Sequence, residues 1–126
     1  MSPKKLEQFR YEGTSWIRTV DYLQQENIML KNRLAQIMQY PVDKNMLEQA
    51  EVYQNIFLGK DAILAILRHD IKEVEKLLLA QKNGEASNTE ARLLKKQLKL
   101  RQDMEKMENE FNRIKKQFNG YLAEAL

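Results

Sequence analysis

The feature that most limits the fold of this chain is a hydrophobic repeat of 3.5 residues. Apolar side chains recur at alternating steps of three and four residues, which places them on one stripe of an α-helix. The stripe continues over several heptads in three successive stretches, and such a repeat predicts left-handed coiled-coil packing. The three stripes, here called seams, are Leu6, Phe9, Gly13, Trp16, Val20, Leu23, Asn27, Leu30, Leu34 and Ile37; Met46, Ala50, Tyr53, Phe57, Lys60, Leu64, Leu67, Ile71, Val74 and Leu78; and Leu93, Gln97, Leu100, Met104, Met107, Phe111, Ile114, Phe118, Tyr121 and Ala125.

Only two stretches break the helical pattern. Pro41 disfavours helix at the residue before it, and Asp43 can cap the helix that follows. Gly84 suits a left-handed helix end, and Ser87 followed by Glu90 fits a capping box. The breaks predict one all-α domain over residues 1–126. We expect an antiparallel three-helix bundle or coiled coil of long helices at about 3–40, 43–83 and 87–125.

Polar residues occupy three positions in the otherwise apolar seams. Asn27, Lys60 and Gln97 are predicted to fix the register of the helices, although a small polar cavity that binds a ligand would use the same residues. The middle helix also carries a flanking apolar row, which predicts contact with more than one neighbour. That row consists of Ile56, Ile63 and Leu77.

Two known architectures share parts of this pattern. The run from Leu23 to Leu34, with Asn27 at a seam position, resembles a leucine zipper. The resemblance is one of packing, because residues 4–18 mix acidic with basic side chains and lack a dense basic helix. The three long heptad helices, with Trp16 in the first seam, resemble a spectrin-type three-helix bundle. That likeness concerns the architecture alone and implies no particular activity. The seam position of Trp16, between Gly13 and Val20, predicts that it is largely buried.

The residue types that carry catalysis are scarce in this chain. Cysteine is absent, His69 is the single histidine, and the seams contain no carboxylate. No glycine-rich phosphate loop is present. We therefore expect no enzyme activity, no cofactor, no metal site and no small-molecule substrate. No run of 18 apolar residues and no apolar leader segment occur, so we expect no membrane span and a cytoplasmic location.

The function predicted from these features is that of a non-catalytic coiled-coil interaction or scaffold protein. It would self-associate, as a homodimer, or bind a helix of another protein, because apolar residues outside the seams would be covered by such pairing. The alternative is nucleic-acid or anionic-surface binding through a basic stretch of the third helix. A net charge of only +3 and the lack of interleaved aromatic residues argue against nucleic acid. The stretch comprises Arg92, Lys95, Lys96, Lys99 and Arg101.

Overall fold

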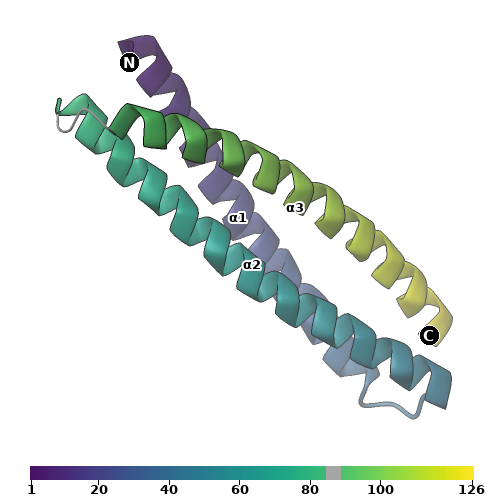
Figure 1. Cartoon of the computed structure of the whole chain (residues 1–126). Coiled ribbons are helices and arrows are strands. Elements are labelled where there is room, and N and C mark those ends of the chain that lie inside the picture. Colours follow the sequence, from purple (N-terminus) through teal and green to yellow (C-terminus); the bar gives the residue numbers. More distant parts are fainter. Residues whose placement is uncertain (85–88) are drawn as a thin grey trace.

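The protein is an antiparallel bundle of three long α-helices. The computed structural model describes residues 1–84 and 89–126, and no strand occurs within them. Helix α1 spans Pro3–Ile37, α2 spans Lys44–Lys82 and α3 spans Thr89–Ala125 (Figure 1). Helix α1 packs more extensively on α2 than on α3. The predicted all-α three-helix bundle is confirmed.

The connection between α1 and α2 begins earlier than the sequence predicts. Helix α1 ends at Ile37 and not near residue 40. The amide of Tyr40 donates to the carbonyl of Ile37 at 3.0 Å, which is the tighter bonding of a closing turn. Pro41 then keeps the chain out of the helical region. The side chain of Asp43 caps α2 as predicted, because it accepts a hydrogen bond of 2.8 Å from the amide of Met46.

The end of α2 follows the predicted glycine cap. Gly84 has a φ of 71°, in the left-handed region that glycine adopts without steric cost. Its amide donates to the carbonyl of Gln81 at 3.2 Å and so closes the last turn. The predicted capping box from Ser87 to Glu90 includes a residue outside the described residues. The third helix is described from Thr89 onward.

The seams form the core nearly as predicted. Most seam residues are buried, including Val20, Phe57 and Leu93, which have no exposed surface. The prediction that Trp16 is largely buried is corrected, because its side chain is only partly buried against the core. Its side chain lines an open side between α1 and α2, where the two helices do not close over it. The other partly buried seam residues are Leu6, Met46, Tyr53 and Ala125.

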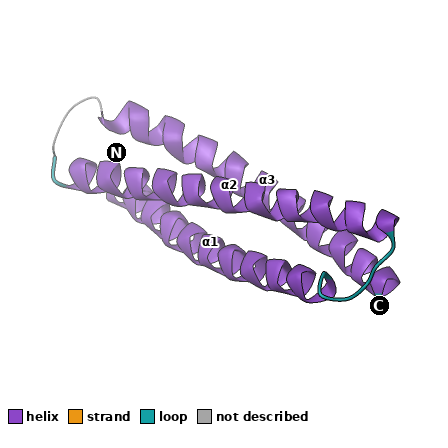
Figure 2. Cartoon of the chain, turned by 90° about the horizontal axis from the view of Figure 1, so that it is seen from below, coloured by secondary structure: helices purple, strands orange, loops and turns teal. Residues whose placement is uncertain are grey.

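The end of the bundle near the α1–α2 connection is closed by aromatic rings. The rings of Phe57 and Phe118 meet edge to face with centroids 5.0 Å apart. Tyr53 and Tyr121 pack beside them at 5.2 Å from each other, and the Tyr121 hydroxyl donates to the carbonyl of Met46 at 3.0 Å. Figure 2 shows this connection at the same end as the C-terminus. Edge-to-face aromatic pairs add to the free energy of burial, so this end is tightly held.

Candidate functional site

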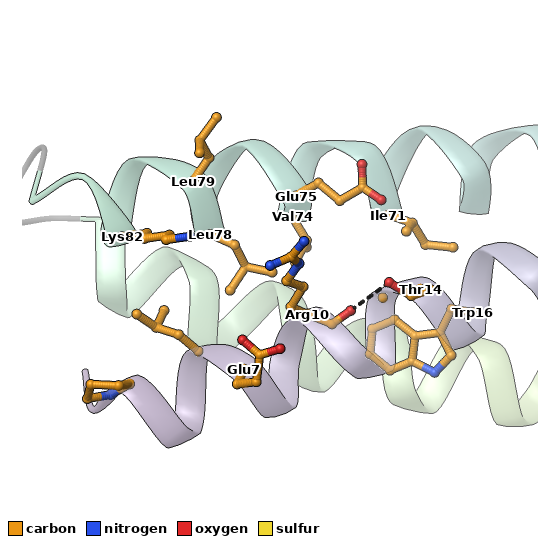
Figure 3. A pocket seen from close by; sticks show the side chains of 13 residues that line it. Glu7, Arg10, Thr14, Trp16, Ile71, Val74, Glu75, Leu78, Leu79 and Lys82 are labelled. Atoms are coloured by element: carbon orange, nitrogen blue, oxygen red, sulfur yellow. Dashed lines mark hydrogen bonds between the residues drawn. The ribbon is translucent and has the colours of Figure 1, made fainter.

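The opposite end of the bundle has an open groove between α1 and α2 (Figure 3). The groove has a volume of about 600 Å³ and follows roughly the first four turns of α1. Its position explains why Trp16 is not enclosed. The lining residues are Pro3, Leu6, Glu7, Arg10, Gly13, Thr14, Trp16, Ile71, Val74, Glu75, Leu78, Leu79 and Lys82.

The floor of the groove is formed by core residues. Ile71, Val74 and Leu78 of α2 are buried seam residues that also line the groove. Gly13 lies across from them in α1 and is itself buried. A Cβ atom added to Gly13 would meet no heavy atom within 4 Å. The seam therefore contains a vacancy at Gly13, in contrast with the close packing of protein interiors.

The rim of the groove carries charges of both signs. Glu7 and Arg10 project from α1, while Glu75 and Lys82 belong to α2. Figure 3 shows the Arg10 side chain extending from α1 toward α2. The hydroxyl of Thr14 donates to the Arg10 carbonyl at 3.1 Å and is thereby occupied. An apolar floor with a charged rim is the arrangement that holds the apolar face of a helix.

At the level of the groove, side-chain hydrogen bonds join α1 to α3. Glu12 accepts two hydrogen bonds of 2.6 Å from the guanidinium of Arg101. Gln97, which is fully buried, donates to the carbonyl of Phe9 at 3.5 Å and to Glu12 at 3.3 Å. The hydrogen bond from Arg101 lowers the pKa of the Glu12 carboxyl despite its burial. This cluster anchors one side of α1 and leaves its other side to the groove.

Asn27 joins α1 to α2 near the middle of the bundle. Its side-chain nitrogen donates to the carbonyl of Phe57 at 2.9 Å and to the Asp61 carboxylate at 2.6 Å. Lys31 binds the other oxygen of Asp61 at 2.5 Å. Burial works to raise the pKa of Asp61, but the hydrogen bonds from Lys31 and Asn27 outweigh it and lower the pKa. Asn27 is thus the buried member of a charged cluster.

Lys60 joins α2 to α3. Its side chain is almost wholly buried, and its ammonium group binds Glu110 at 3.1 Å. That hydrogen bond lowers the pKa of the Glu110 carboxyl. The three polar seam residues therefore bond across three different helix pairs and are not gathered into one polar cavity. Among the described residues, the side-chain oxygens of Asn27 and Gln97 lack a hydrogen-bond partner.

The flanking row of α2 lies outside the groove. Ile56 and Leu77 are partly buried against the core, whereas Ile63 is 43% exposed. None of the three lines the groove. Their placement widens the apolar surface of α2, as the sequence indicates. Their role in an interface stays a prediction.

The basic stretch of α3 is partly occupied by ion pairs within the protein. Arg101 binds Glu12 of α1, and Lys99 binds Asp103 at 3.1 Å. Arg92 and Lys95 are exposed, and Lys96 is half-buried. Two of the five cations thus already have acidic partners, which reduces the positive charge available to an anionic ligand.

The groove itself was not predicted from the sequence. Its one local signal is Gly13 in a seam position, next to the large seam residue Trp16. In residues 1–84 and 89–126, no three acidic or histidine side chains gather as a metal site would require. The same part of the chain has no helix that is long and apolar enough to cross a membrane. Comparison with protein-family models, curated proteins and solved structures finds no match.

Proposed function

We propose that this protein is a non-catalytic interaction module whose α1–α2 groove binds an amphipathic helix of a partner protein. The observation that carries the proposal is the vacancy at Gly13 above the buried side chains of Ile71, Val74 and Leu78. A helix lying in the groove would fill this vacancy. The bundle would then have four helices at this end and three at the other.

The spacing of the lining residues favours a helical occupant. On α1, Leu6, Arg10 and Gly13 follow steps of four and three residues, and α2 contributes Ile71 and Leu78 at a full heptad. Two helical walls with this spacing present ridges and holes that mesh with a third helix. The partner helix should therefore carry apolar residues at i, i+3 or i+4, and i+7.

The polar groups of the groove support binding rather than catalysis. Its charged side chains stand at the rim, and the hydroxyl of Thr14 is bonded to a backbone carbonyl. Activation of a nucleophile needs a hydrogen bond to a base, whereas the Thr14 hydroxyl donates to the Arg10 carbonyl and not to the carboxylate of Glu7 or Glu75. The mixed rim charges would orient the partner through pairs with its polar face.

Trp16 provides the test, because it is the single tryptophan and lines the groove. The probe is a synthetic amphipathic peptide of about five helical turns with leucine at heptad positions. We expect it to shift the Trp16 emission saturably to shorter wavelength, as its apolar face excludes water from the indole. Gly13→Leu should abolish the shift, since the new side chain would occupy the vacancy.

Two controls make the result specific. A peptide of the same length and charge with glutamine in place of leucine should give no shift. Circular dichroism should show that the Gly13→Leu variant remains helical. A leucine peptide that causes no saturable shift in the unmodified protein would refute the proposal, and so would an equal shift in Gly13→Leu.

A further inference from the structure

The outward side of α2 carries a second heptad row, separate from the groove. Its residues follow steps of three and four like those of the seam, but every one of them is exposed. Its members lie alternately two positions and one position after a seam residue, so that the row faces away from the core. We call it the outer row. It comprises Glu48, Glu51, Asn55, Leu58, Ala62, Ala65, His69 and Lys72.

The central part of this surface has no charged side chain. Between residues 52 and 66 of α2, every exposed residue is uncharged, although 31% of the whole chain is charged. The two charged residues of that segment are Lys60, which binds Glu110, and Asp61, which binds Lys31. The surface also contains Leu58, which is 53% exposed. An uncharged strip about four turns long on a highly charged protein indicates a contact surface.

The ends of the outer row carry opposite charges. Glu48 and Glu51 lie near its beginning and Lys72 lies near its end. His69 is neutral at pH 7, and the exposed Lys44 and Lys76 continue the same steps beyond Glu48 and Lys72. An antiparallel copy of the same row, centred on residue 60, would place Glu48 opposite Lys72 twice, and Glu51 opposite the neutral His69. Lys44 would lie opposite Lys76 in the outermost layer, beside the Glu48–Lys72 pair. A parallel copy would instead place Glu48 against Glu48, which is unfavourable. The Glu48–Lys72 pairs and the opposite net charges of the two ends therefore favour the antiparallel direction.

The same register matches large side chains with small ones. Leu58 would lie opposite Ala62, and Asn55 opposite Ala65, so that each layer has one small member. The row occupies two alternating heptad positions, and each layer pairs one position from one helix with the other position from the second helix. This is the layering of antiparallel coiled coils. Beside the row, Gly59 would lie opposite Asp61 of the copy, and its lack of a side chain would allow the backbones to approach closely. Asn27 and Lys31 of α1 donate hydrogen bonds to the Asp61 carboxylate and hold it toward α1, away from the copy.

We propose that the protein forms a twofold homodimer in which the outer row of α2 pairs antiparallel with the outer row of a second copy, centred on residue 60. A twofold axis repeats every contact, as isologous interfaces do. The partner in self-association is a second copy of this chain. It uses a surface apart from the groove, so a monomeric protein would still bind the leucine peptide, and loss of peptide binding would leave the dimer intact.

Charge exchange tests the register. Sedimentation equilibrium of the unmodified protein should give a mass of twice 15.0 kDa. Glu48→Lys would bring a second lysine side chain near Lys72 at both ends of the dimer, and Lys72→Glu would create two acidic pairs. Each variant should raise the dimer Kd about tenfold at low salt. The double variant Glu48→Lys with Lys72→Glu should return the Kd to within about threefold of the unmodified protein, because attraction is restored with the signs reversed.

A central substitution tests the contact itself. Ala62→Glu would bury a charge against Leu58 of the second copy and should yield a monomer. Asn109→Glu is the matched control, since it adds the same charge at an exposed site on α3 and should leave the mass unchanged. Circular dichroism verifies that all variants remain helical. A monomeric unmodified protein, a dimer that persists in Ala62→Glu, or a double charge exchange as weak as the single ones would each overturn the proposal.

Discussion

Replacing Gly13 with alanine should stabilise the protein. Gly13 lies inside α1, where glycine costs about 1 kcal/mol relative to alanine because of the backbone freedom lost on folding. The added methyl group would point into the vacancy without meeting any heavy atom within 4 Å. If it is buried there against the core, it contributes up to about 0.8 kcal/mol more.

The expected gain in the free energy of unfolding is therefore about 1–2 kcal/mol. For a chain of 126 residues this corresponds to a rise in Tm of about 4–8 °C. Urea denaturation followed by circular dichroism gives the free energy, and thermal denaturation gives the Tm. Gly120→Ala is the matched control, because Gly120 lies in α3, is exposed, and also has no heavy atom near an added Cβ. It should gain the helix contribution alone, at most about 1 kcal/mol.

The comparison of the two alanine variants separates two physical effects. A loss of stability in Gly13→Ala would show that the space beside Gly13 is filled, and the basis for the groove would fail. An equal gain in Gly13→Ala and Gly120→Ala would show that the methyl group at residue 13 stays in water. Only a larger gain at residue 13 agrees with a vacancy lined by apolar side chains.

Three further substitutions or conditions test the packing, the helix end and the ion pairs. Phe57→Ala should lower the free energy of unfolding by about 3–5 kcal/mol, because the ring is fully buried against Phe118; a loss below about 1 kcal/mol in urea denaturation would contradict this packing. Gly84→Ala should cost about 1–2 kcal/mol, since its φ of 71° is unfavourable for other residues, and an unchanged Tm would argue against the left-handed cap. The lowered pKa of Glu12 contributes stability that is present above its ordinary value of 4.5 and is lost as the pH falls through the folded-state value. Urea denaturation across that range should show a smaller loss in Glu12→Gln than in the unmodified protein, whereas equal losses would remove Glu12 from the explanation.

Much of the fold could be predicted because one repeat fixes which side of each helix is buried. Consecutive residues of an α-helix lie about 100° apart around its axis, so a stripe shifted by one residue would no longer face the core. The repeat therefore determines that Val20, Phe57 and Leu93 are buried. The sequence predicts an end of α1 near residue 40, three residues too late. The last turn is decided by the hydrogen bond from Tyr40 to Ile37, and propensity alone does not distinguish that turn from a continuing helix.

The candidate site was much less accessible to sequence reasoning. Arg101 looks like part of a basic patch, but its partner Glu12 comes from another helix and no local pattern connects the two. The burial of Trp16 depends on the separation between α1 and α2 at the groove. The spacing of apolar residues along one helix does not determine that separation. Only Gly13, a small residue in a seam, indicates where the core is incomplete.

The contrast between the two ends of the bundle has a consequence for hydrogen exchange. Near Phe57 and Phe118 the helices are held by interlocked rings, and amides there should exchange only when the whole protein unfolds. The first turns of α1 border the groove and lack such packing on one side. We therefore expect these turns to separate from α2 in a sub-global opening that leaves the aromatic end intact. Their amides should exchange faster than the amides near the rings.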